Sequence, residues 1–575
     1  MRKNRSTKPK SFQRAETRSA SSNAPSSSLT RRKFLGSMSG AAVASLAASA
    51  IALEPVVGSK GSIAKANEVG PVTGTARQTA ARQVRRDAAQ LAFNRGIPAH
   101  PCNGEESAYG GTFVANFTKA LPHNSFGEVS PSAYNALLAA LTSGNNADFE
   151  AIPLGGVRPL RNPQAGLAFD LEGADSHALA IRPAPRVDGP ENSSEAGELY
   201  WMALARDVNF TDYANNQLIA DAARDLSKFS DFRGPKVGHR VRPATIFRGN
   251  TPGDLAGPYL SQFLLLDIPY GSLTISQRQT AVLPPAQGGA DYMTDVASWL
   301  SIQNGNNPAA SPVLDPTPRF IRNGRDISRY VQVDALYEAY LNACLILLGM
   351  NAPFDPGLPY TTPGKQDGFA TFGGPHILSL LTEVATRGLK AVWYEKWSVH
   401  RRARPEAFGG LVHFQITQNR YPFVDREILR SDSLSRTFSQ FGTYLLPQAY
   451  PEGSPVHPAY GAGHATVAGA CVTILKAWFD ESFVIPNPVV PSSDGLALVP
   501  FVGGPALTVG GELNKVASNV AFGRDFAAIH WRTDASESFT LGEQIAITIL
   551  EEQKATYNEI HSFSLTKFDG TTITI

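Results

Sequence analysis

The sequence predicts a mainly α-helical protein, a large helical bundle with long loops and minimal β-structure. Three observations support this class. Helical periodicity recurs along most of the chain, and strand-like patterns are few and short. The 41 prolines and 50 glycines punctuate long connections and follow no repeat of about 20 to 50 residues. With 575 residues, of which 42% are hydrophobic, the chain is long enough to bury a large core.

Apolar residues spaced three to four apart mark the predicted helices. These cover residues 78–93, 130–140, 199–229, 291–302, 328–348, 375–400, 463–479 and 540–552. Ser130 is the expected N-cap of the second helix, with Pro131 in its first turn. Residues 150–195 are rich in Gly, Pro and Ala and predict loop. Short strands are expected at 571–575 and at 501–502.

The first 66 residues have the composition of an export segment. Residues 1–29 are basic and serine-rich, which predicts disorder. The pair Arg31 and Arg32 then precedes a small, apolar stretch over 36–53, the order of a twin-arginine signal peptide. Candidate cleavage sites lie at residues 64–66 and 48–50; the first leaves a mature chain of 67–575. We therefore expect a periplasmic or extracellular protein. A basic tail followed by a chance apolar run is the alternative.

Bulk properties exclude several classes of protein. The net charge of only +2 provides no global field for nucleic acid or an anionic membrane. No segment of the mature chain reaches the roughly 18 uninterrupted apolar residues of a membrane span. Cys102, Cys344 and Cys471 form no metal-ligand spacing, and at most one internal disulfide is possible. An anion site, if present, must be built locally.

A first chemical cluster ends the helix predicted over 375–400. Lys396 and Arg404 are eight residues apart, which is only about 80° of rotation on a continuous helix. Pro405 biases Arg404 toward an extended backbone, so we expect Arg404 just past the helix end. Two neighbouring cations favour an oxyanion, with Arg supplying a fork and Lys a point charge. Taken alone, a basic helix end is more often a solvated cap.

A second cluster covers residues 457–465 and leads into the helix predicted over 463–479. Small residues before a helix let an anion approach the free N–H groups of its first turn. His464 lies in that turn, where it can exchange protons with an anion. Taken alone, a single histidine in the first turn of a helix more often has no catalytic role.

The third cluster covers residues 523–534. Arg524 and His530 are six apart, about 240° around a helix, so they can serve one site only if the helix breaks between them. His530 and Asp534 are four apart and share a face, which lets the carboxylate orient the imidazole. An ordinary surface ion pair is the alternative. Together the three clusters supply three cations, two histidines, a helix N-terminus and a carboxylate, a set that suits phosphate or vanadate.

The ordered pattern Lys…Arg-Pro, Gly-His and Arg…His…Asp resembles the vanadium haloperoxidases and their phosphatase relatives, the type-2 phosphatidic acid phosphatases and bacterial acid phosphatases. The eight-residue step from Lys396 to Arg404, and His457 seven residues before His464, are similar to the bromoperoxidase branch. Residues 116–119, 121–124, 263–271 and 341–348 also resemble red-algal and cyanobacterial bromoperoxidases. The likeness covers roughly residues 80 to 560. It implies two packed four-helix bundles, with the anion site at about 325–555.

The resemblance also implies residue roles. His530 would coordinate vanadium and be the metal ligand, Asp534 would orient it, and His464 would act as acid and base. Lys396 would also polarise bound peroxide. Pentavalent vanadium would work as a Lewis acid, without haem or flavin. The residues implied to bind the cofactor are Lys396, Arg404, Gly463 through its backbone N–H, His464, Arg524 and His530.

Hydrogen peroxide, halide and small organic acceptors are the implied substrates, and a homo-oligomer between dimer and dodecamer is the implied assembly. His457 and Glu395 would line the halide pocket. Two departures stand out. Ala462 replaces the serine of the family's Ser-Gly-His, which removes a hydrogen bond of about 0.5–1.5 kcal/mol. Glu395 stands where red-algal enzymes tend to carry Arg, which puts halide preference in doubt.

Two other functions fit the same residues. A phosphatase would use His530 as the nucleophile and form a phosphohistidine. The second function is that of a non-catalytic, anion-binding export protein, in which Ala462 would indicate that the catalytic activity has been lost. Retained phosphate-ester hydrolysis would support the first, and tight vanadate binding without turnover would support the second.

Overall fold

Helices dominate the part of the chain that the structure describes, residues 70–575 of a computed structural model. The predicted export segment, 1–66, lies outside the described residues. Within them the strands form only three short antiparallel pairs, and the mainly α-helical class with minimal β-structure is confirmed. The pairs are β1 (Ile268–Tyr270) with β2 (Leu273–Ile275), β3 (Val489–Pro491) with β4 (Leu498–Pro500), and β5 (Ser564–Thr566) with β6 (Thr572–Thr574).

The helices fall into long and short groups. The longer ones are α1 (Gly74–Asn94), α3 (Pro131–Ser143), α5 (Pro190–Leu204), α6 (Gln217–Leu226), α7 (Val296–Gln303), α8 (Gly324–Val333), α9 (Glu338–Gly349), α10 (Gly374–Tyr394), α11 (Pro405–Gln418), α13 (Asp432–Phe441), α14 (Gly463–Trp478), α15 (Val509–Phe526) and α16 (Arg532–Lys554). The short ones are α2 (Glu105–Ala108), α4 (Asn146–Glu150), α12 (Arg426–Leu429), and the single turns η2 (Ala165–Leu167), η3 (Ser176–Ala178), η4 (Phe210–Asn215), η5 (Gln262–Leu264) and η6 (Pro285–Gln287). A π-helical turn, η7 (Glu395–His400), continues α10.

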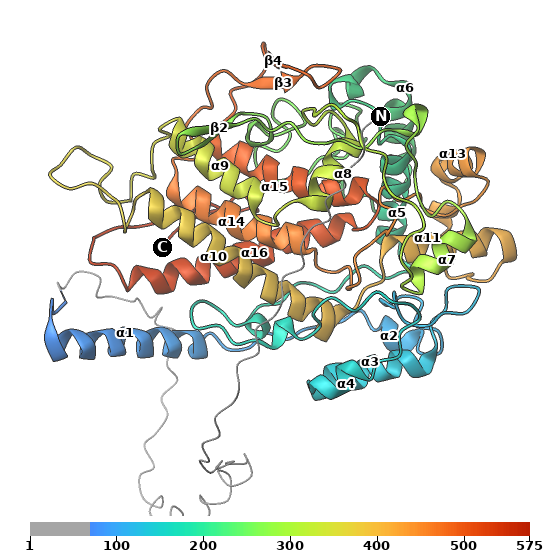
Figure 1. Ribbon diagram of the computed structural model, residues 1–575, viewed down its shortest axis with the longest axis horizontal. Coiled ribbons are helices and arrows are strands. Elements are labelled where there is room, and N and C mark those ends of the chain that lie inside the picture. Colours follow the sequence, from blue (N-terminus) through green and yellow to red (C-terminus); the bar gives the residue numbers. More distant parts are fainter. Residues whose placement is uncertain (1–69) are drawn as a thin grey trace, which may run out of the picture. The chain divides into compact units, whose positions relative to one another are not determined.

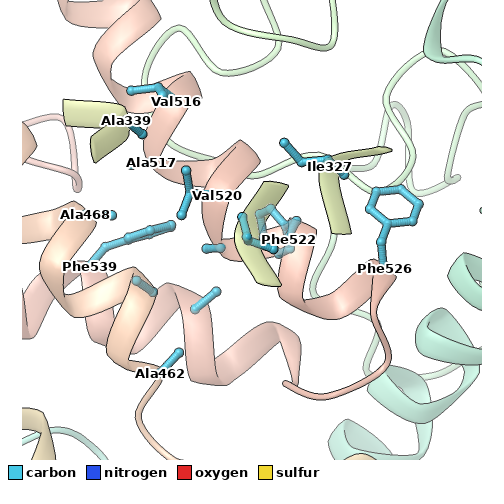
Figure 2. Packing of buried hydrophobic residues seen from close by; sticks show 14 of the residues in the cluster. Ile327, Ala339, Ala462, Ala468, Val516, Ala517, Val520, Phe522, Phe526 and Phe539 are labelled. Carbon is cyan, nitrogen blue, oxygen red and sulfur yellow. The ribbon is translucent and has the colours of Figure 1, made fainter. Parts of the chain in front are cut away.

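The main bundle consists of α10, α14, α15 and α16, with α14 at its centre (Figure 1). Almost every residue of α14 is buried. Close approach of α14 and α16 requires glycine, because a Cβ at Gly469 would strike the Phe539 carbonyl and one at Gly542 the Thr466 carbonyl. Ala468, Val520 and Phe539 gather between α14, α15 and α16 (Figure 2). The first turn of α14 is therefore fixed by packing on several sides.

A second, smaller bundle surrounds α5. The helices α6, α12 and α13 pack against α5, of which only three residues escape burial. The two-bundle fold implied by the resemblance is thus confirmed, although α12 contributes only a single turn. Helix α5 also faces α15, which joins the two bundles.

Several predicted helices differ in their bounds. The segment predicted over 328–348 is two helices, α8 and α9, bent by 99° at residues 334–337. The segment predicted over 199–229 breaks at 205–216 and starts earlier, at Pro190. Helix α15 was not predicted, since Gly510, Gly511 and Gly523 weaken its helical pattern. The strand expected at 571–575 is confirmed as β6, whereas 501–502 lies just after β4.

Two further properties bear on the predictions. In the described residues no single helix is long and apolar enough to cross a membrane, and α8 with α9 meets the length and composition requirement only as a bent pair. Cys102, Cys344 and Cys471 are all free thiols, and the last two are buried.

Candidate functional site

Lys396 is placed by the π-helical turn that ends α10. Such turns often occur at functional sites because they redirect side chains. The side chain is fully buried, and its Nζ donates to the carbonyls of Pro458 (2.7 Å) and Ala459 (2.9 Å). An ammonium has three donors, so one remains available. Burial, and then the charge of Arg404, lowers the pKa of Lys396 well below its ordinary value.

Arg404 lies just past the helix end, as predicted. It has an extended backbone and forms the N-cap position of α11. Its Nε donates to the His457 carbonyl (2.8 Å), and its two Nη atoms reach His530 Nε2 (2.9 Å) and His457 Nδ1 (2.8 Å). Burial without a directly paired carboxylate lowers the pKa of Arg404 to about 9. The lowered pKa means that the Arg404 cation is not fully compensated by negative charge around it.

His530 and Asp534 form the predicted pair. His530 Nδ1 lies 2.8 Å from Asp534 Oδ2, and both side chains are buried. A carboxylate accepts, so Nδ1 carries the proton and Nε2 keeps its lone pair. That lone pair points toward Arg404, and no acid stands beside it. Burial, followed by the charges of Arg404 and Lys396, lowers the pKa of His530 well below its ordinary value. The imidazole is thus kept neutral and can act as a ligand or nucleophile.

The break predicted between Arg524 and His530 is present. Helix α15 ends at Phe526, Ala528 adopts a left-handed backbone (φ 64°), and α16 starts at Arg532. Arg524 donates through one Nη to the Val331 carbonyl, while its buried Nε has no partner. The Arg524 charge contributes to lowering the pKa of both His464 and His530, so the break brings it toward the same pocket.

The first turn of α14 completes the site. Ala462 is its N-cap residue and Gly463 its first residue, so the N–H groups of Gly463 and His464 have no partner within the helix. His464 Nε2 lies 3.0 Å from Asp334 Oδ1. The His464 side chain is 15% exposed, more than the other cations and histidines of the site, so solvent can reach it. Burial lowers the pKa of His464, although Asp334 favours its charged form. An anion placed at the helix end would raise that pKa again.

Glu395, predicted to line the halide pocket, makes its contacts with two other histidines, and its place in that pocket stays a prediction. Its Oε1 bonds His100 Nδ1 (3.0 Å), and His400 Nε2 lies 3.0 Å from its Oε2. Burial raises the pKa of Glu395 to about 7, and only His100 among the charged groups opposes this. The contacts printed for the Glu395 carboxylate are thus with His100 and His400, and none is with Lys396, Arg404 or His530.

Trp393 instead lies against His457. The two rings are 4.7 Å apart between centroids, and the Trp393 ring is 5.7 Å from Lys396 Nζ. A Cβ built on Gly463 would meet Trp393 at 3.2 Å, so the indole also covers the start of α14. His457 contacts both Arg404, through its Nδ1, and the Trp393 ring. It therefore lies beside the cations predicted to form the site. The spacing of three residues from Lys396 was the signal that could have identified Trp393.

Sequence reasoning also missed the residues behind the pocket. Asp334 lies at the unpredicted break between α8 and α9. Arg402 donates to Asp534 Oδ1 (3.0 Å) and to Glu195 Oε2 (2.8 Å) of α5, and both its partners are buried. Arg402 therefore links the smaller bundle to the carboxylate that orients His530. Ala462 offers no hydroxyl; its backbone N–H donates to Ser538 Oγ (2.9 Å).

Comparisons with known proteins agree with this geometry. Residues 432–559 match the family model described as the VCPO second helical-bundle domain. A vanadium-dependent bromoperoxidase of Corallina pilulifera is 40% identical, aligned over 87% of this chain and 98% of its own length. One of Ascophyllum nodosum is 37% identical, over 80% and 86%. The homohexameric structure of the second vanadate-dependent bromoperoxidase from Ascophyllum nodosum superposes with a TM-score of 0.81 at 30% identity, covering 91% of this chain and 94% of that one. The chain belongs to the vanadium-dependent bromoperoxidase family.

Proposed function

We propose that this chain is a vanadate-dependent haloperoxidase that oxidises bromide or iodide with hydrogen peroxide to hypohalous acid, which then halogenates organic acceptors. The observation that carries the proposal is a buried cluster in which three cations and two histidines with lowered pKa values gather near a helix N-terminus. Bromoperoxidase relatives that match along nearly their whole length support it. The phosphatase alternative, through a phosphohistidine at His530, is not favoured.

The residues present fit a vanadate anion. Lys396, Arg404 and Arg524 face only Asp334 and Asp534 among the carboxylates described above, which leaves an excess of positive charge. The buried Nε of Arg524 has no partner, and the pKa values of Lys396 and Arg404 are lowered by burial. A bound oxyanion would accept a hydrogen bond from the Arg524 Nε, and its negative charge would raise the pKa values of Lys396 and Arg404.

We assign roles on this basis. Lys396, Arg404, Arg524 and the Gly463 N–H would hold the oxyanion's oxygens, and the lone pair of His530 Nε2 would bind vanadium. Bound vanadate would supply a pentavalent Lewis acid that activates peroxide, without haem or flavin. Asp534 holds the proton at His530 Nδ1, which keeps Nε2 available.

Proton transfer is assigned to His464. Its Nε2 is engaged by Asp334, so Nδ1 is the atom left to give or take a proton at the anion. Asp334 stabilises the charged imidazolium; burial alone would raise the pKa of Asp334, but the His464 charge and bond lower it overall. Trp393 would form the apolar wall of the halide pocket and His457 the polar wall, since their rings lie 4.7 Å apart between centroids.

Halogenation of a phenol-red-type dye tests the function. The purified full chain would be assayed with peroxide and bromide in phosphate-free buffer, with and without orthovanadate. Vanadate-dependent dye bromination supports the proposal, and replacing bromide by iodide or chloride ranks the halides. Vanadate binding without turnover of any halide would contradict it and would favour the non-catalytic alternative.

We also propose export through the twin-arginine pathway, with cleavage near residue 66, and assembly as a homo-oligomer. The Arg31-Arg32 pair and the following apolar stretch support export, and the homohexameric relative supports assembly. Cell fractionation of an R31K/R32K variant tests export. Retention of the variant inside the cytoplasm, with the wild type outside, is expected; equal distribution would contradict it.

A further inference from the structure

Helix α1 has no partner within the described residues of its own chain. It spans 21 residues, and none of them is buried. In Figure 1 it lies apart from the bundle helices. Most helical stability in proteins comes from packing one face against other elements, and no such packing is present here. Within residues 70–575, α1 therefore keeps a largely uncovered surface.

The exposed side chains of α1 are strongly basic. Arg77, Arg82, Arg85 and Arg86 stand against a single acid, Asp87. Among residues 70–575, none of these four arginines takes part in an ion pair, whereas Arg95, just after the helix, binds Glu551 (2.8 Å) and Glu552 (3.1 Å) of α16. The helix is thus anchored at its C-terminal end and presents unpaired cations along its length.

An acidic and apolar patch surrounds that anchor. Phe169 and Leu171 are 84% and 98% exposed, and Gly173, two residues on, donates to Glu552 Oε2 (2.7 Å). Isolated apolar side chains are common on surfaces, but large ones gathered beside a chain anchor mark an interaction site. The acidic members are Glu172, Glu383 (43% exposed side chain) and Glu551 (41%).

Glu383 pairs with Arg387 (3.2 Å), whereas Glu172 lies beside Glu383 and has no ion pair within residues 70–575. Burial, and then the nearby charge of Glu383, raises the pKa of Glu172, although Arg387 partly compensates. Neighbouring carboxylates repel each other, and an added cation would relieve that repulsion. The patch is complementary in charge to α1.

In residues 70–575 the arginines of the arm, Arg77, Arg82, Arg85 and Arg86, form no ion pair with their own patch. At about 1.5 Å per residue, Arg86 and Arg77 lie roughly 14 Å and 27 Å along the helix from Arg95, which is fixed beside the patch. We infer that α1 of one copy lies on the patch of a second copy of this chain, formed by Phe169, Leu171, Glu172, Glu383 and Glu551, and that the exchange is reciprocal. A reciprocal exchange between two copies closes with two-fold symmetry. The inference rests on the proposed homo-oligomer and identifies its contact.

Charge-swapped variants test the exchange directly. R82E/R85E/R86E reverses the arm, and E383K/E551K reverses the patch while Arg387 keeps Asp170 and Arg95 keeps Glu552. In light scattering of the full chain, the wild type should have at least twice the mass of one chain, and each variant alone should lose this pairing. An equimolar mixture should regain it, because arm and patch are then complementary in both directions. K236E/R240E/R242E, with exposed cations elsewhere, is the matched control and should assemble like the wild type.

Three results would overturn the inference. A monomeric wild type would remove the homo-oligomer itself, while leaving halide oxidation to be judged by the dye assay. An oligomer that both charge variants retain would place the contact elsewhere. A monomer whose α1 binds vesicles of anionic lipid, with binding lost in R82E/R85E/R86E, would assign the arm to a membrane surface.

Discussion

Arginine serves opposite purposes in two regions of this molecule. In the anion pocket Arg404 is 1% exposed, and its fork donates to backbone carbonyls and ring nitrogens. On α1 the arginines are exposed, and none of them is paired in residues 70–575. The cations of the anion site are already desolvated in the folded protein, so an incoming oxyanion meets fixed hydrogen-bond donors. The arm leaves its cations hydrated, which suits a contact that forms and closes between copies. Burial, more than residue type, separates a cofactor site from an assembly surface.

The largest contrast should come from truncating one arginine in each region. Arg404→Ala leaves the His457 carbonyl, the Ile529 carbonyl and two histidine nitrogens without their donor. Each buried acceptor left without a donor costs about 1–3 kcal/mol, and removal of a buried cation that lacks a paired carboxylate offsets part of this, so we expect a net loss of about 1–3 kcal/mol of unfolding free energy. Arg82→Ala on the arm should change the stability of the monomer by no more than about 0.5 kcal/mol. Urea unfolding of both variants measures this; equal losses would show that Arg404 is not structurally fixed.

Glu395 should make stability depend on pH. Burial raises its pKa from 4.5 to about 7, so the folded protein holds a proton that the unfolded chain releases between these values. The contribution of Glu395 to stability is therefore fully present below pH 4.5 and falls as the pH rises to about 7, by roughly 3 kcal/mol in total. Glu395→Gln should lack this loss and become relatively more stable at alkaline pH. Melting temperatures of both proteins across this window check the sign.

The same variant tests whether Glu395 lines the halide pocket. If the side chain faces His100 and not the halide pocket, Glu395→Gln should keep the wild-type ratio of bromide to iodide turnover. A changed ratio, with peroxide affinity unaltered, would place Glu395 in the pocket.

Smaller effects should follow when the support behind His530 is weakened. Glu195→Gln leaves Arg402 with a neutral partner and loosens its hold on Asp534. Changes to groups that orient a metal-binding histidine typically cost about 10- to 100-fold in affinity. We expect about tenfold weaker vanadate binding by equilibrium dialysis, with turnover at saturating vanadate largely retained. Glu191→Gln, also on α5 but paired with Arg182 away from the pocket, is the control and should bind vanadate normally.

Residue spacing and local backbone preferences in the sequence predicted much of this site. The residues that were missed contact it from segments far away in the sequence. Pro405 placed Arg404 beyond a helix end, and the 240° rotation between Arg524 and His530 required the break now found at Ala528. Asp334 and Glu195 approach the pocket from distant segments, so no spacing in the sequence could indicate them. The contacts of Glu395 with His100 and His400 also join segments far apart or on another side of the turn, so the sequence pattern did not indicate them.

Vanadate binding by the wild type and by His530→Ala, followed by dye bromination, tests the central claim most directly. The account predicts bound vanadate and vanadate-dependent bromination in the wild type. It predicts binding weakened by more than about 100-fold, with turnover lost, in the variant. An unchanged melting temperature would show that the variant is folded. Wild-type binding and turnover in His530→Ala would contradict the assignment of His530 as the vanadium ligand and the site built around it.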